Sequence, residues 1–168
     1  EWMKKRQKIA IGDQPAWYPK EWNIENNASL RYQLNRAKNK EVIVKEKNNI
    51  DPIRFQLETC LEEWIDQRPF FTLHYLTEPR ILSQLTSRRV FVATQNEKIV
   101  AYLVLSPIPL KKGWLIEQII RKKDAPNGTS ELLVDTVMKV IAKEGYEYAT
   151  MGLTPLSPSS EPLLSQNP

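Results

Sequence analysis

The stretch IIRKKDAPNGTSELLVDTVM, residues 119–138, joins an apolar strand-like segment to a helix-like segment through a charged Asn-Gly turn. Apolar residues at helical spacing predict a helix over 129–143, which Gly145 is expected to end. The next apolar segment, 147–152, predicts a strand. Because a strand, a helix and a neighbouring strand in this order usually form a right-handed parallel crossover, we expect 113–121 and 147–152 to lie side by side and parallel in one sheet.

Outside this stretch, the hydrophobic pattern predicts an α/β domain with one mixed sheet. Consecutive strands joined by short turns, ending with 113–121, predict an antiparallel meander. Asn26 or Asn27 can cap the first helix, and Asp51 can cap the second. The remaining expected strands cover 8–11, 41–46, 89–94 and 98–106, and the remaining expected helices cover 28–40, 52–67 and about 78–85.

The chain of 168 residues has the size of one ordinary domain, and its 41% hydrophobic and 26% charged residues are typical of a globular protein. Positive charge is concentrated at the start, because residues 1–47 hold 11 Lys and Arg against 6 Asp and Glu. A basic segment can face nucleic acid, anionic lipid or only water. No apolar run is long enough to cross a bilayer, and without an initiator Met or a signal peptide the sequence is expected to be a piece of a longer chain.

The sequence contains no set of residues suited to bind a metal ion or to form a Ser/His/Asp catalytic triad. Cys60 is the only cysteine and lies on the apolar stripe of an expected helix, so we expect it to be a small buried side chain. His74 is the only histidine, and no cluster of metal-ligand spacing or Ser/His/Asp arrangement can be built around it. We therefore expect neither a metal site nor triad hydrolysis.

The Asn-Gly turn can bind an anion. The backbone amides of 128–130 are first-turn donors at the positive end of a helix dipole, and Arg121 precedes them together with two lysines. In open α/β sheets, ligands bind at the carboxyl ends of strands, where this turn is expected. The alternative is purely structural, with Asn127 as the N-cap of the helix and Gly128 as an ordinary turn residue.

Two separated motifs resemble one family. The segment RKKDAPNGTSELLVDTVM with YATMGLTPLS, and the earlier SLRYQLNRAKNKEVIV, resemble the C-terminal catalytic domain of phosphatidylglycerol lysyltransferases, from about residue 8 to Ser157. The resemblance implies a GNAT-like (GCN5-related N-acetyltransferase-like) fold. It also implies transfer of an aminoacyl group from aminoacyl-tRNA to a lipid headgroup at the cytoplasmic face of a membrane, without a cofactor.

Carried over by position, the resemblance gives Arg121 a catalytic role. Glu117 is the second catalytic candidate because it could hold a substrate amine or accept a proton, but it could equally be a strand glutamate paired with Lys112 or Arg121. Gln118 stands where the family often has Asp, and Glu117 would face the opposite side of a regular strand unless a bulge re-aims it. The residues expected to bind substrate are Gln118, Asn127, Gly128, Thr129, Gly152, Thr154 and Ser157.

The basic helix expected over 28–40 provides a second candidate site. Arg31, Arg36 and Lys38 are expected to bind a polyanion, either tRNA or anionic lipid, and the alternative is that they form a solvated helix face. Besides these partners, the resemblance implies peripheral contact with a membrane and either a protein partner or a second lobe of the same chain.

The expected domain runs from 28 to 157, after a linker or the end of a preceding lobe (1–27) and before a Pro- and Ser-rich tail (158–168). A GNAT-like fold normally continues with another helix and two strands after the strand that ends near Gly152. The chain continues instead with TPLSPSSEPLLSQNP. We therefore expect the sheet either to lack these elements or to be completed by another segment.

Two alternatives to aminoacyl transfer stay open. The first is an acyltransferase that uses acyl-coenzyme A, although the usual coenzyme A loop is richer in Gly or Arg than KKDAPNGT. The second is a non-catalytic binding or assembly module that keeps the fold, which Gln118 and the missing terminal elements favour.

Overall fold

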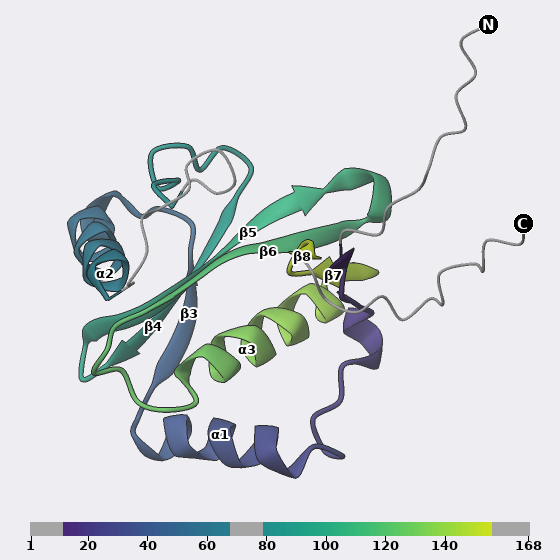
Figure 1. Ribbon diagram of the computed structural model, residues 1–168, viewed down its shortest axis with the longest axis horizontal. Coiled ribbons are helices and arrows are strands. Elements are labelled where there is room, and N and C mark those ends of the chain that lie inside the picture. The colour runs from purple at the N-terminus through teal and green to yellow at the C-terminus, as the bar shows by residue number, and fades with distance from the viewer. Residues whose placement is uncertain (1–11, 68–78, 156–168) are drawn as a thin grey trace, which may run out of the picture.

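The computed structural model describes residues 12–67 and 79–155. Its main element is a six-stranded mixed sheet with the strand order β2-β7-β6-β5-β4-β3, and a separate ribbon pairs β1 with β8 (Figure 1). The strands are β1 Gly12–Asp13, β2 Ala16–Trp17, β3 Ile43–Lys47, β4 Arg89–Gln95, β5 Lys98–Ile108, β6 Gly113–Arg121, β7 Tyr148–Thr150 and β8 Thr154–Pro155. The helices are α1 Ala28–Asn39, α2 Arg54–Asp66 and α3 Thr129–Lys143, with short 3₁₀ turns at Pro19–Glu21, Asp51–Ile53 and Pro109–Lys111.

The strands β4, β5 and β6 form the antiparallel meander predicted from the sequence. The β4–β5 connection is a tight turn in which Asn96 and Glu97 both have positive φ, 47° and 63°. Such a turn matches the right-handed twist of the two strands it joins. β3 pairs antiparallel with β4 and forms one edge of the sheet.

The helix α3 connects β6 to β7, and these two strands are adjacent and parallel, as predicted. Gly145 follows the helix with a φ of 85°, and the amide of Tyr146 donates to the carbonyl of Ile141 at 3.0 Å, which satisfies a carbonyl at the end of the helix. The parallel pairing covers only three residues of each strand and ends at Leu115 and Thr150. Beyond that point the strands separate, and the chain after β7 pairs with β1 instead.

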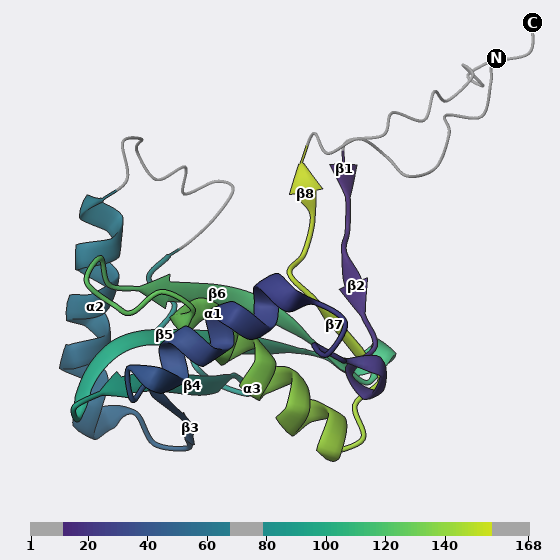
Figure 2. The ribbon, with the colours of Figure 1, turned by 90° about the horizontal axis from the view of Figure 1, so that it is seen from below.

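Hydrophobic cores lie on both faces of the sheet. α1 and α3 cover one face and α2 covers the other (Figures 1 and 2). Successive residues of β5 alternate between them, so that Leu103 packs on the α1/α3 side and Tyr102 on the α2 side. Cys60 of α2 is fully buried, as predicted, and burial raises the pKa of its thiol to about 12.

Three predictions about helices, two on their N-caps and one on a short helix, have different outcomes. Asn27 caps α1, since its side-chain oxygen accepts from the amide of Leu30 at 2.9 Å. Asp51 does not cap α2; it begins a 3₁₀ turn, and its carboxylate pairs with Arg54 at 3.0 Å. The helix expected around 78–85 is wrong, because 79–85 has no helical hydrogen-bond ladder and instead contains a turn closed from Gln84 to Ile81.

The segment before α1 extends the main sheet. β2 pairs antiparallel with β7, so that Trp17 lies opposite Ala149. Trp22 then donates from its indole nitrogen to the buried carboxylate of Asp135 on α3, at 3.0 Å. The sheet is therefore extended beyond β7 by another segment of the chain, one of the two expected outcomes. The strand expected at 8–11 lies outside the described residues.

Candidate functional site

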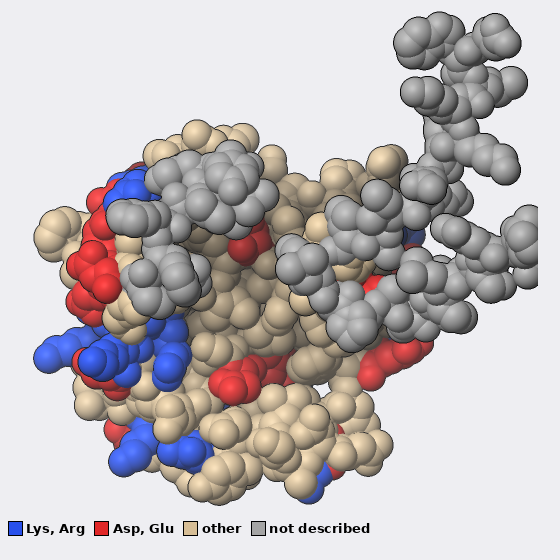
Figure 3. All heavy atoms as spheres, viewed as in Figure 1, with Lys and Arg blue, Asp and Glu red and all other residues tan. Residues whose placement is uncertain are grey.

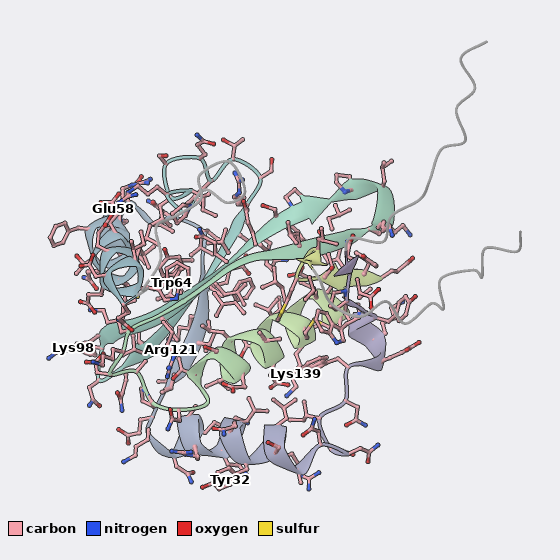
Figure 4. The ribbon with its side chains drawn as sticks, viewed as in Figure 1. Tyr32, Glu58, Trp64, Lys98, Arg121 and Lys139 are labelled. Carbon is pink, nitrogen blue, oxygen red and sulfur yellow. The ribbon has the colours of Figure 1, made fainter. Side chains whose placement is uncertain are left out.

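A polar cleft with a volume of about 360 Å³ lies where the start of α3 meets α1 and the end of β6. Figure 4 shows Arg121 at the end of β6, beside the loop that leads to α3. The residues that line the cleft are Gln33, Arg36, Arg121, Asn127, Gly128, Ser130 and Glu131. The structure thus brings the predicted turn together with Arg36, which the sequence placed in a separate basic helix.

Gly128 is in direct contact with α1. Its φ is 89°, and a Cβ built at this position would lie 1.9 Å from the carbonyl oxygen of Gln33. Gly128, and not Asn127, is the N-cap of α3, and no side chain accepts a capping hydrogen bond there. The alternative in which Asn127 caps the helix is therefore wrong, and the glycine is required because the backbone of the turn packs on the backbone of α1.

The first turn of α3 presents only some of its hydrogen-bond donors to the cleft. Thr129, expected to bind substrate, does not line the cleft, because its amide and its hydroxyl both donate to the carbonyl of Pro126, at 3.2 and 2.6 Å. The amides of Ser130 and Glu131 have no acceptor among the described residues. Gln33 adds a side-chain amide whose oxygen is buried and has no hydrogen-bond partner among the described residues. Rotation of that amide by 180° presents its NH₂ group to the cleft instead.

The two arginines of the cleft form no ion pair with another described residue. Arg121 donates one hydrogen bond, to the carbonyl of Ala125 at 3.2 Å, and the guanidinium of Arg36 lies 5.6 Å from the ring centre of Tyr32. Within residues 12–67 and 79–155, neither arginine has a carboxylate within 4.0 Å. An anion can therefore bind both guanidinium groups without first breaking an ion pair between them and a carboxylate of the protein.

The lysines of the turn contribute less than the sequence suggested. Lys122 pairs with Glu63 of α2 at 2.8 Å, and this hydrogen bond raises its pKa. Lys123 is exposed. Neither of these lysines lines the cleft.

Glu117 and Arg121 lie on opposite faces of the sheet. The register of β5 and β6 shifts at Val104, so that Glu117 is an extra residue in β6 and its side chain joins Gln118 on the α2 face. Arg121 is opposite Ala101, whose side chain packs on the α1/α3 face. The structure therefore does not bring the two expected catalytic residues together.

The carboxylate of Glu117 is fully engaged. Arg88 donates to both of its oxygens, at 2.7 and 3.1 Å, and Ser106 donates a further hydrogen bond. The hydrogen bonds from Arg88 lower the pKa of Glu117. The partner is thus neither Lys112, which pairs with Glu147 at 3.2 Å, nor Arg121.

We expect the contribution of Glu117 to stability to disappear in acid. Because its pKa is lower in the folded than in the unfolded chain, the contribution is present above the unfolded value of about 4.3 and is lost as the pH falls through the folded value. Urea unfolding should show wild type about 1 kcal/mol more stable than Glu117→Gln near neutral pH, and this difference should shrink as the pH falls below about 4.3. A difference that persists in acid contradicts the ion pair.

The other expected substrate-binding residues lie elsewhere. Gln118 donates to the carbonyl of Pro79 at 2.7 Å, and its oxygen is buried without a partner in the part of the chain that the structure describes. Gly152 lies near Leu115 at the far end of β6, about 20 Å from Arg121 at the usual strand rise. Thr154 is in β8, opposite Asp13 of β1, and Ser157 is outside the described residues.

Two residues of the cleft were not singled out from the sequence: Gln33 and Glu131. Glu131 follows Ser130 in the first helical turn, where the sequence did indicate the amides of 128–130. Gln33 carries no local signal, because its place in the cleft depends on the packing of α1 against Gly128.

The sequence profile of the family described as phosphatidylglycerol lysyltransferase, C-terminal, matches residues 19–166. The chain belongs to this family. The match includes α1, the whole sheet from β3 to β7 and the cleft, and it confirms the resemblance seen in the two motifs. Comparison with curated proteins gives no match.

Solved structures of the family share the fold of the chain. L-PGS from Bacillus licheniformis matches with a TM-score of 0.71 and 20% identity over 93% of this chain and 49% of its own. The C-terminal domain of an Agrobacterium fabrum protein described as a lysylphosphatidylglycerol synthetase matches with a TM-score of 0.68 and 22% identity over 86% of this chain and 47% of its own. The chain thus spans about half the length of these structures.

The fold is the GNAT-like α/β fold predicted from the sequence. A GNAT-family acetyltransferase from Desulfovibrio desulfuricans matches with a TM-score of 0.50 and 15% identity over 62% of this chain and 68% of its own. Of the helices described, none combines the length and apolar character required to pass through a bilayer.

Proposed function

We propose that this domain transfers an aminoacyl group from aminoacyl-tRNA to a lipid headgroup at the cytoplasmic face of a membrane, and that the cleft at the start of α3 holds the donor. Membership of the lysyltransferase family supports the reaction class. One observation supports this site most directly: Arg36 and Arg121 line the same cleft, next to the amides of the first turn of α3. Among the described residues, neither arginine has a carboxylate partner, and the amides of Ser130 and Glu131 have no acceptor.

The cleft matches the charges of such a donor. A phosphate group accepts hydrogen bonds from Arg121, Arg36 and the amide of Ser130, with the helix dipole adding to the attraction. Glu131 is the one carboxylate among the residues that line the cleft, and it can hold the ammonium group of the aminoacyl part. In this scheme Glu117 is not a catalytic base, because Arg88 and Ser106 occupy its oxygens on the other face of the sheet.

A transfer assay tests the proposal. The chain is mixed with tRNA carrying a radiolabelled amino acid and with phosphatidylglycerol vesicles, and labelled lipid is measured. We expect Arg121→Ala to reduce transfer about tenfold or more, because one charge-assisted contact to the donor is lost. Lys143→Ala removes the same charge at the opposite end of α3 and should leave transfer unchanged. Acetyl-coenzyme A offered as the donor should give no product.

A non-catalytic anion-binding module is the second candidate. The ion pair of Glu117 with Arg88 favours it, since no free carboxylate remains at that position to act as a base. This candidate predicts that the cleft binds anions while the chain transfers nothing from any aminoacyl-tRNA. Binding and transfer measured on the same preparation therefore separate the two.

A further inference from the structure

We propose that the outer face of α1 binds the single-stranded end of an RNA, with Tyr32 as the stacking platform for one base and Arg36 as the link to the cleft. This role of α1 rests on the proposed function and deepens it, because it identifies the surface along which an RNA-borne donor reaches the cleft. The charge of α1, the exposure of Tyr32 and the position of Arg36 carry the inference.

The charge of α1 differs from that of the other helices described. Residues 28–40 contain Arg31, Arg36, Lys38 and Lys40 and no Asp or Glu. Both α2 and α3 contain acidic residues as well as basic ones. In the part of the chain that the structure describes, no carboxylate lies within 4.0 Å of the charged groups of these four residues. In Figure 3, Lys and Arg atoms lie over the C-terminal part of α1, at the lower left, and a larger group mixed with Asp and Glu lies above them.

Tyr32 is the large hydrophobic side chain that α1 exposes, with 61% of its surface accessible. Figure 4 shows it on the side of α1 that faces away from the sheet. Arg36 follows one turn later, with its guanidinium carbon 5.6 Å from the ring centre of Tyr32, and it also lines the cleft. Tyr32, Arg36 and the cleft thus form one continuous surface with an aromatic face at one end and phosphate-binding groups at the other.

Single-stranded nucleic acid is the polyanion that this surface fits. Such strands are bound by aromatic side chains that stack on bases and by cations that follow the backbone. A helix that lies on a membrane instead buries an apolar face in the lipid. Apart from the small side chain of Ala28, the exposed residues of α1 around Tyr32 are polar: Ser29, Arg31, Asn35, Arg36 and Asn39. A single aromatic ring among cations and amides therefore favours an RNA end over a lipid surface.

The test uses a short single-stranded RNA with 2-aminopurine near its 3′ end, whose fluorescence falls when the base stacks. We expect Tyr32→Ala to weaken binding by about 5- to 150-fold and to abolish the stacking signal. Tyr32→Phe should keep both, because the ring face remains. Tyr18→Ala is the matched control: Tyr18 is 59% exposed, between β2 and the 3₁₀ turn Pro19–Glu21, and the substitution should change neither.

The inference is overturned if Tyr32→Ala binds the RNA as wild type does and keeps the fluorescence change. It is also overturned if the substitution leaves RNA binding intact but releases the chain from phosphatidylglycerol vesicles, which assigns α1 to a membrane. Binding of inorganic phosphate to wild type and to Arg121→Ala tests the cleft separately. If phosphate binds through Arg121 and Tyr32 has no effect on RNA, the inference about α1 fails while the proposed donor site stands.

Discussion

Replacing Gly128 with Ala should lower the free energy of unfolding by about 3–5 kcal/mol, the upper part of the combined cost of a left-handed residue and an overpacked contact. The residue has a φ of 89°, and its Cβ would lie 1.9 Å from the carbonyl oxygen of Gln33. Because that oxygen belongs to the backbone of α1, no side-chain rotation relieves the contact. Helix α1 must move away from α3, which also opens the cleft. Chemical denaturation of both proteins measures the difference.

Gly145→Ala is the matched control. Gly145 also follows a left-handed path, with a φ of 85°, but no atom lies within 4 Å of its built Cβ. We expect this substitution to lower the free energy of unfolding only by the cost of placing Ala in a left-handed conformation, about 1–2 kcal/mol. Equal losses for Gly128→Ala and Gly145→Ala would show that α1 does not press on the start of α3, and the cleft as described would not exist.

Arg121→Ala should weaken the binding of inorganic phosphate about 10- to 150-fold, which corresponds to the loss of about 1.5–3 kcal/mol for a hydrogen bond to a charged group. The fold should be little affected, because among the described residues the side chain of Arg121 donates one hydrogen bond, to the carbonyl of Ala125. Arg121→Lys should recover part of the affinity, since it keeps the charge but loses the planar fork. Calorimetric titration measures each affinity.

A change in net charge alone also weakens anion binding, so Lys143→Ala is measured beside Arg121→Ala. Lys143 lies in the last turn of α3, about 20 Å from the first turn at the usual helical rise. We expect it to bind phosphate as wild type does. If both variants lose affinity equally, the effect comes from the overall charge, and Arg121 is not part of an anion site.

The sheet and the crossover follow from information that is local in the sequence. The spacing of apolar residues in 129–143 and the apolar segments on either side predict a strand, a helix and a parallel strand, and β6, α3 and β7 form that unit. The handedness rule leaves one way to connect them. The same local reasoning fails at 79–85, where Ile81, Leu82 and Leu85 pack in the core on the α2 side at a spacing that also suits a helix.

Only part of the candidate site could be predicted from the sequence. The turn with its amides and Arg121 was predicted because all its parts lie within a dozen residues of one another. Arg36 and Gln33 join the cleft through the contact of α1 with Gly128, which is a tertiary contact without a local signature. The face on which Glu117 lies was left open for a related reason: strand alternation cannot show whether a bulge is present, and the extra residue in β6 turns this side chain to the α2 face.

The central claim is that the start of α3 is an anion site, and the most direct measurement follows its backbone amides by NMR while inorganic phosphate is added. The amides of Ser130 and Glu131 are the reporters, because no described residue accepts a hydrogen bond from them. We predict that both shift along a saturable curve in wild type, and that the curve is about tenfold or more weaker in Arg121→Ala. Amides that do not move at millimolar phosphate, or that move alike in both proteins, would contradict the claim.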